Sequence, residues 1–181
     1  MGKHAGRFPE SSVSWRDLLG EKMIFVTVGS QKFQFDRLLR SIDEQLASGK
    51  IKDEIFAQIG FSTYRPKHYK FENFLDREEF EKKVLESEIV ITHGGTGAIV
   101  GTLKKGKKVI AVPRLAKYGE HVDDHQLQLI GQFGAHRMIC ACYEPEQLWE
   151  AITRAKQTDY VLYKSNTGRF IEKIRAYILH L

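Results

Sequence analysis

Hydrophobic residues follow two patterns along this chain. Short apolar runs predict strands, and segments with helical spacing between these runs predict helices. Between the strands, segment 35–42 has helical spacing, with Leu38, Leu39 and Ile42 on one face. Repeated units of this kind predict an α/β fold, in which a Rossmann-like parallel sheet carries helices on both faces. The short apolar runs that predict strands lie at residues 24–28, 54–59, 89–91 and 109–112.

Start and stop signals predict where further helices begin and end. Asp76 is a plausible N-cap for a helix that continues through Glu86. Another helix is expected from about residue 123 to 133, where Gly134 would stop it. Pro145 suits the first turn of the helix that follows.

The last predicted helix spans residues 169–181 and is amphipathic. Arg169, Lys173 and Arg175 give it positive charge beside an apolar face. We expect this face to pack on its own domain, with docking to a partner protein or to the membrane surface as the alternative. The apolar residues of that face are Phe170, Ile174, Tyr177, Ile178 and Leu181.

Length and composition predict one globular domain. The chain has 181 residues, of which 42% are hydrophobic and 28% are charged, which is enough for a buried core. Residues 1–22 show no periodicity and are interpreted as a leader, although Trp15, Leu18 and Leu19 suggest a short helix. The domain is expected over residues 23–181. Because the sequence has neither a membrane-length apolar run nor a signal-peptide core, we expect a cytoplasmic protein.

Cysteines and histidines give little support for a metal site. Cys140 and Cys142 share one face of an apparent strand over residues 137–142, which predicts buried, reduced thiols. The spacing of His121 and His125 would place both on one face of a helix. Since no further ligands complete either pair and the HExxH signature is absent, we expect no bound metal.

The net charge of +5 raises the question of nucleic acid. Only residues 104–108 form a dense basic run, which lies in a helix-to-strand turn where a solvated loop is the favoured interpretation. Contact of this run with anionic lipid or a phosphorylated substrate stays open. The remaining charge is scattered and has no aromatic-basic face, so we expect no nucleic-acid partner.

The glycine-rich turn at residues 93–97 is the most informative segment. Its glycines let the backbone approach a diphosphate, and the first N–H groups of the following helix stabilise negative charge. His93 is interpreted either as a neutral hydrogen-bond partner or as an imidazolium that contacts phosphate. Gly29 and Ser30 form a similar turn after the first strand, where ligand binding and simple chain reversal are both open. In a parallel sheet both turns would lie at the carboxyl edge, where ligands bind.

A polar cluster at residues 119–126 follows the strand that ends at Pro113, and its side chains suit sugar hydroxyls. Asp123 and Asp124 also fit a solvated helix start, but Gln126 is not needed for one. The chain lacks a Walker lysine and the GxGxxG pattern. Phosphate binding without these features predicts that a diphosphate is held as a leaving group.

These motifs together resemble the C-terminal, donor-binding half of the GT-B glycosyltransferases of family 28. Within that group the chain is most similar to the short Alg13-like, PssE-like and EpsF-like subunits of exopolysaccharide and capsule biosynthesis. The likeness covers most of the chain after Met23. It is carried by residues 25–30, 35–38, 58–60, 91–95, 112–114, 119–122 and 124–126.

The resemblance implies transfer of a hexose, such as galactose, glucuronate or GlcNAc, from a UDP-sugar to a lipid-diphosphate-linked glycan, with no metal or other cofactor. Val100 and Gly101 stand where larger relatives carry an acidic residue for the ribose. The glycine-rich turn would hold the diphosphate and the polar cluster the sugar. The donor-binding residues implied are Gly29, Ser30, His93, Gly94, Gly95, Thr96, Gly97, Arg114, Glu120, Asp124, His125 and Gln126.

A chain of this length corresponds to one of the two Rossmann-like halves of a GT-B enzyme. The resemblance therefore implies a membrane-anchored, Alg14-like or PssD-like partner with the acceptor site, and a peripheral location at the inner face of the membrane. Glu120 and His121 are the candidate catalytic bases on this chain, unless the partner supplies the base. Alternatively, the chain is a non-catalytic subunit that binds a nucleotide sugar and activates a partner transferase.

Overall fold

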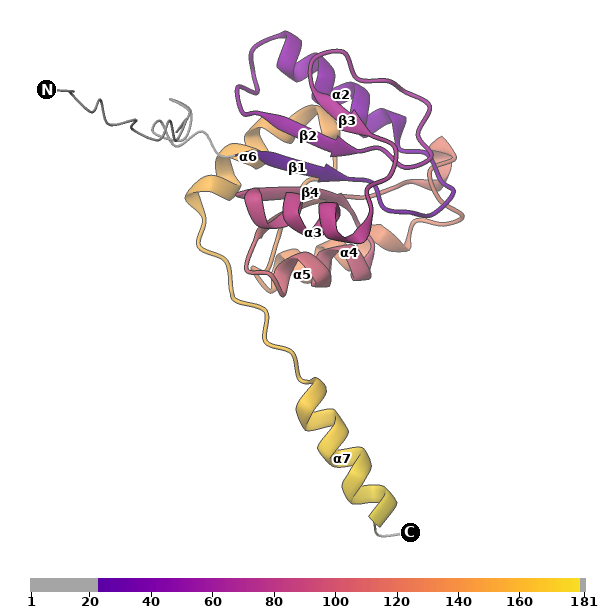
Figure 1. Ribbon diagram of the computed structural model, residues 1–181, viewed down its shortest axis with the longest axis vertical. Helices are drawn as coiled ribbons and strands as arrows, with labels where there is room; N and C mark the ends of the chain where they lie inside the picture. The colour runs from indigo at the N-terminus through magenta and orange to yellow at the C-terminus, as the bar shows by residue number, and fades with distance from the viewer. Residues whose placement is uncertain (1–22, 180–181) are drawn as a thin grey trace, which may run out of the picture.

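The computed structural model describes residues 23–179 (Figure 1). The predicted leader at 1–22, with its suggested helix near Trp15, lies outside the described residues, as do Leu181 and the side chain of Phe170. The strands are β1 (Ile24–Thr27), β2 (Ile55–Gln58), β3 (Lys70–Glu72), β4 (Ile89–His93), β5 (Lys108–Val112) and β6 (Cys140–Ala141). The α-helices are α2 (Asp36–Ala47), α3 (Arg77–Glu86), α4 (Thr96–Leu103), α5 (His125–Ala135), α6 (Leu148–Gln157) and α7 (Thr167–Leu179), and the 3-10 helices are η1 (Ala116–Tyr118) and η2 (Pro145–Gln147).

The strands form one parallel sheet in the order β3-β2-β1-β4-β5-β6. The chain first builds outward from β1 to β3, and then returns to the other side of β1 to add β4, β5 and β6. The strand order therefore reverses between β1 and β4. In open α/β sheets ligands bind outside the carboxyl ends of the strands at this reversal. The predicted Rossmann-like fold is confirmed.

The two faces of the sheet are covered by different helices (Figure 1). Ile24 and Val26 of β1 belong to an apolar cluster with α2 and α6. Phe25, which points to the opposite face, packs with Val84 of α3, and α4 and α5 continue that layer through Ile99 and Ile130. Both faces of the central strands are thus buried, as expected for a parallel sheet.

Local signals placed several elements correctly. The Asp76 side chain accepts a 2.8 Å hydrogen bond from the Glu79 backbone N–H and caps α3, as predicted. Pro145 begins η2, which runs directly into α6. Cys140 and Cys142 are both buried free thiols, and burial raises the pKa of Cys142 to about 12.

Two boundaries differ from the prediction. Helix α5 begins at His125 rather than at residue 123, and it runs through Gly134 to Ala135. Gly134 lies against β6, where an added Cβ would sit 3.4 Å from the Cβ of Ala141, so its small size serves helix–sheet packing. Strand β6 is shorter than the predicted run because Arg137 has a positive φ of 53° and still belongs to the turn after α5.

Helix α7 contradicts the expectation that it packs on its own domain. Figure 1 shows it standing away from the sheet at the end of an extended segment. Its apolar residues are open to solvent, with Ile174 43% exposed, Tyr177 69% and Ile178 60%. The apolar side chains of α7 therefore have no buried partner surface in the described part of the chain. Among the described helices, none is long and apolar enough to cross a membrane.

Candidate functional site

The glycine-rich turn links the end of β4 to the start of α4 at the point where the strand order reverses. Gly95 is the N-cap residue of α4, and within the described chain no side chain caps this helix start. The first N–H groups of an α-helix have no partner inside the helix. Thr96 and Gly97, which carry two of these groups, are exposed. The turn therefore presents uncapped backbone donors and the positive end of a helix dipole.

His93 lies between the two glycine turns, and both turns leave room for its ring. A Cβ added to Gly29 would lie 2.6 Å from Cε1 of His93, and one added to Gly95 would lie still closer to Nε2. Gly29 also has a positive φ of 80°, which disfavours other residues. Both glycines are therefore required by a close approach to His93, and Gly29 by its backbone geometry as well.

The environment of His93 selects one of its two predicted roles. Burial lowers its pKa to about 4, and the nearby Arg114 and His121 act in the same direction. At neutral pH the imidazole is therefore uncharged. This favours a neutral hydrogen-bond partner beside the turn over an imidazolium that contacts phosphate.

Arg114 is fully buried and runs from the end of β5 to the loop after β1. Its Nη2 donates to the carbonyl oxygens of Val28, at 2.6 Å, and of Phe33, at 3.1 Å. Burial lowers its pKa to about 10, so it keeps its charge at neutral pH. Its Nε and Nη1 are buried, and no described residue accepts a hydrogen bond from them. Arg114 thus adds a partly unpaired positive charge beneath the site rather than a side chain that reaches a ligand directly.

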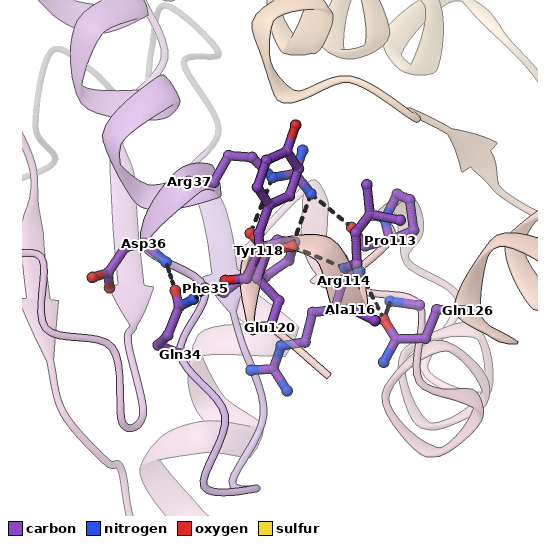
Figure 2. Close-up of polar contacts among 12 residues, drawn as sticks. Gln34, Phe35, Asp36, Arg37, Pro113, Arg114, Ala116, Tyr118, Glu120 and Gln126 are labelled. Atoms are coloured by element: carbon purple, nitrogen blue, oxygen red, sulfur yellow. Dashed lines mark hydrogen bonds and ion pairs between the residues drawn. The ribbon is translucent and has the colours of Figure 1, made fainter. Parts of the chain in front are cut away.

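Gln126 joins the two loops that follow β4 and β5 (Figure 2). Its Oε1 accepts hydrogen bonds from the backbone N–H groups of Gly94 and Arg114, both at 3.0 Å. The residue is only 2% exposed, and an added Cβ on Gly94 would lie 2.8 Å from the Cβ of Gln126. The structure therefore gives Gln126 the position of a clamp that fixes the glycine turn.

Glu120 forms a buried ion pair with Arg37 of α2 (Figure 2). Arg37 donates from Nε to Oε1 and from Nη2 to Oε2, both at 3.0 Å, and the Leu115 N–H donates to Oε2 at 2.9 Å. Glu120 has no exposed surface. Both carboxylate oxygens are engaged, so the geometry fits a loop-organising residue and does not fit the predicted catalytic base.

The remaining residues of the polar cluster differ in how open they are. Asp124 accepts a 2.7 Å hydrogen bond from the Ala116 N–H and is exposed, as is His125. His121, the second predicted base, has a side chain that is 10% exposed, and its ring packs 4.9 Å from that of Phe33. Asp124 and His125 therefore stay accessible to a ligand, whereas His121 is mostly covered.

A cleft of about 460 Å³ adjoins the glycine turn and was missed by sequence reasoning. Helices α3 and α4 form its walls, and Gly29 and Ser30 lie at the β1 end. Phe74 and Leu75 come from the loop before α3, where the Leu75 N–H donates to the buried Gln58 side chain at 3.1 Å. The sequence signal that could have indicated the cleft is the apolar pair Phe74 and Leu75 directly before the N-cap Asp76.

Small residues keep the α4 wall of this cleft open. A Cβ on Gly97 or Gly101 would meet no atom within 4 Å, so both glycines leave space toward the cleft that they line. Lys105, in the turn after α4, and Glu81 of α3 also line the cleft and form a 3.3 Å ion pair. The basic run at 104–108 was interpreted as a solvated loop, but one of its residues, Lys105, lines the cleft.

The structure brings most of the predicted donor-binding residues to one edge of the sheet. Gly29, Ser30 and the turn at 93–97 lie at the ends of β1 and β4, and Arg114, Glu120 and Gln126 follow β5. The exposed members are Ser30, Thr96, Gly97, Asp124 and His125, and Gly29, His93 and Gly95 are half-buried. Gly94, Arg114, Glu120 and Gln126 are buried.

Comparison with known families and curated proteins places these motifs in context. The family model described as glycosyltransferase family 28 C-terminal domain matches residues 23–178. The human protein named UDP-N-acetylglucosamine transferase subunit ALG13 is 30% identical over 132 residues, which is 67% of this chain and 11% of that protein. The mouse protein of the same name is 27% identical over 130 residues, with the same coverage. The chain thus matches a small part of these relatives.

Solved structures support the fold. The glycotransferase of kitacinnamycin has a TM-score of 0.59 and 18% identity, over 87% of this chain and 40% of that chain. The solution structure of ALG13 has a TM-score of 0.52 and 20% identity, over 80% of this chain and 90% of that chain. At these identities the likeness establishes a shared GT-B-type domain fold and no more.

Proposed function

Because the chain belongs to the glycosyltransferase family 28 C-terminal domain family, we propose that it is the donor-binding subunit of an inverting UDP-sugar glycosyltransferase. The reaction would transfer a hexose to a lipid-diphosphate-linked sugar in polysaccharide biosynthesis. One observation carries this proposal: the uncapped start of α4 faces a cleft at the reversal of strand order.

The diphosphate is assigned to the start of α4. Backbone donors at Thr96 and Gly97 would bind its oxygens, and the buried charge of Arg114 would favour a negative ligand nearby. When the glycosidic bond to UDP breaks, negative charge grows on the departing diphosphate. Fixed donors in a partly buried site stabilise such charge without reorganising, so no metal is needed for this step.

The nucleoside is assigned to the cleft between α3 and α4. Phe74 and Leu75 supply an apolar surface for the base, and Gly97 and Gly101 leave room for it. No carboxylate stands at Gly101 to meet the ribose hydroxyls. Glu81, which lines the same cleft from α3, is the acidic group within it that fits this task.

The sugar of the donor is assigned to the exposed side of the polar cluster. Asp124 and His125 are open to solvent. They directly precede Gln126, whose side chain binds the glycine turn, so they lie close to that turn. Glu120 and Gln126 support this loop from within, as their buried hydrogen bonds indicate.

One observation favours the second candidate function, in which the chain binds the nucleotide sugar but carries no base. Glu120 is engaged by Arg37 and His121 is mostly covered, so neither predicted base is ready to take a proton from an acceptor hydroxyl. We therefore place the base on a partner subunit that also holds the acceptor. The exposed apolar side of α7 is the surface we assign to that partner, which would hold this chain at the inner face of the membrane.

The test is a calorimetric titration of the chain with UDP, UDP-galactose, UDP-GlcNAc and UDP-glucuronate, with and without chelator. We expect binding that chelator does not reduce. Gly101→Leu fills the cleft, and Lys104→Leu places the same side chain on the exposed C-cap position at the end of α4, outside the cleft. The first variant should bind UDP at least about tenfold more weakly, which corresponds to roughly 1.4 kcal/mol, and the second should bind normally.

Two outcomes would count against the proposal. Equal affinity of the two variants would place the nucleotide outside the cleft. Failure of all four compounds to bind the folded chain would contradict a donor site on this subunit.

A further inference from the structure

Three side chains of types that bind metals meet where the loop after η1 enters α5. His125 Nδ1 is hydrogen-bonded to Asp123 Oδ1, and His121 Nδ1 lies 3.5 Å from the same oxygen. The candidate ligand atoms of His121, Asp123 and His125 all lie within 4.8 Å of one another. The two imidazole rings pack edge to face, with centroids 4.9 Å apart.

His121 is the second, independent sign of a ligand. Its side chain is 90% buried, because the exposed fraction is 10%, and its Nδ1 is a buried atom that receives no hydrogen bond from the described residues. Its nearest polar contact is the 3.5 Å approach to Asp123 Oδ1, and a buried polar atom without a hydrogen bond costs roughly 1–3 kcal/mol. That nitrogen points toward the place where Asp123 and His125 meet.

We propose that His121, Asp123 and His125 form a binding site for a divalent transition-metal ion of the Zn²⁺ class. Imidazole nitrogen and carboxylate oxygen are ligands that Zn²⁺ takes at about 2.0–2.2 Å, and three protein ligands leave one tetrahedral position open. Ligands at such bond lengths stand roughly 3.4 Å apart around a tetrahedron, close to the distance between His121 and Asp123. The partly exposed Asp123 and His125 side chains, 58% and 46% open, can separate to admit the ion.

The sequence pattern predicted no metal here because it places both histidines on one helix and provides no third ligand. In the structure α5 begins at His125, so His121 stands in the preceding loop. Asp123 supplies the third ligand from the turn between them. The proposed site therefore combines His121 and Asp123 of the loop with the first residue of α5, and it is an alternative to our expectation of no bound metal.

Occupancy of this site has a consequence that rests on the proposed function. His125 belongs both to the metal site and to the surface assigned to the donor sugar. A bound ion would hold its imidazole away from that sugar. We therefore expect the ion to compete with a UDP-sugar and not to assist transfer.

The test is a titration of the full chain with Co²⁺, followed by visible absorption, in a His4→Ala/His180→Ala background that removes imidazoles outside the described residues. Nitrogen and oxygen ligands in low coordination should give visible d–d bands without a thiolate charge-transfer band, which would reveal Cys140 or Cys142. Asp123→Asn and His125→Ala should each weaken binding at least about tenfold, since even outer partners of metal ligands have effects of this size. His136→Ala, on an exposed residue after α5, is the matched control and should bind normally.

His121→Phe keeps the packing on Phe33 and should also lose the Co²⁺ bands. Equal binding by Asp123→Asn, His125→Ala and the parent chain would overturn the site, as would a thiolate band or no binding at all. A second measurement adds a saturating UDP-sugar. A weaker apparent Co²⁺ affinity would support the shared use of His125, and an unchanged affinity would overturn that shared use. The Co²⁺ titration without nucleotide does not depend on donor binding, so it fails or succeeds separately from the proposed function.

Discussion

Two loops meet at the carboxyl edge of the sheet, and they use their hydrogen-bonding groups differently. The glycine turn after β4 contributes backbone donors at the uncapped start of α4. The polar loop after β5 has far more side-chain groups, but Glu120 and Gln126 direct theirs inward, to Arg37 and to the backbone of Gly94 and Arg114 (Figure 2). The polar loop after β5, which has more side-chain groups, thus holds the glycine turn after β4 in place.

A high density of polar residues in a sequence therefore does not show that their side chains are available to a ligand. A buried polar group has to be paired within the protein, because leaving it unpaired costs free energy. Once paired, it is no longer open to substrate. Glu120 or Gln126 would be an exception if its substitution changed ligand binding or transfer without affecting the fold.

The largest expected effect is on the Glu120–Arg37 ion pair. Glu120→Ala leaves the Arg37 guanidinium without its carboxylate and should lower the free energy of unfolding by about 3 kcal/mol, as expected when one partner of a buried pair is removed. Chemical denaturation measures this loss. Asp124→Ala, on an exposed neighbour in the same loop, is the control and should lose much less stability.

The double variant Glu120→Leu/Arg37→Met tests the same ion pair by removing both charges. It should be more stable than Glu120→Ala, since no charge is then left buried alone. If Glu120→Ala instead keeps its stability and binds donor normally, but transfer by the assembled complex stops, Glu120 is the base and our reassignment is wrong.

A smaller effect is expected at the clamp. Gln126→Ala leaves the N–H groups of Gly94 and Arg114 without their shared acceptor, which should lower stability by about 2 kcal/mol. UDP affinity should fall with it because the glycine turn loses its support. Gln128→Ala, on an exposed position of the same helix, should change stability by no more than about 0.5 kcal/mol. A stable Gln126→Ala chain that has lost only sugar discrimination would show that Gln126 contacts the donor.

Two glycines of the same turn should separate packing from binding. Gly95→Ala places a methyl group against the His93 ring and should cost about 1–2 kcal/mol of stability through overpacking. Gly97→Ala meets open space and favours the helix, so it should add up to about 1 kcal/mol. Thermal melts measure both changes. We expect the stabilised Gly97→Ala variant to bind UDP less well than the parent, since its methyl group points into open space beside the cleft, and unchanged binding would place the diphosphate elsewhere.

The sequence predicted what depends on local backbone and on periodicity. The alternation of strands and helices, the Asp76 cap and the glycine turn all follow from neighbours in the chain. The role of Glu120 could not be predicted in this way, because Arg37 is 83 positions away and its contact depends on how α2 packs beside the loop after β5. Helix α7 shows the same limit, since an apolar face does not tell which surface covers it.

The smallest expected effect concerns the charge of His93. Burial and the nearby Arg114 and His121 lower its pKa in the folded chain to about 4, below the ordinary value of about 6.5. The unfolded chain therefore takes up the proton first as pH falls, and this contribution to stability is lost progressively between about pH 6.5 and 4. From pH 7.5 to 6.0 the loss should stay under about 1 kcal/mol. Denaturation across this range should show a flatter pH dependence for His93→Asn than for the parent, and an unchanged one for the exposed-site control His136→Asn. If His93→Asn keeps the full slope, His93 has the same pKa in the folded and unfolded chain, and the turn after β4 would then offer a side chain that becomes charged below about pH 6.5 in addition to its backbone.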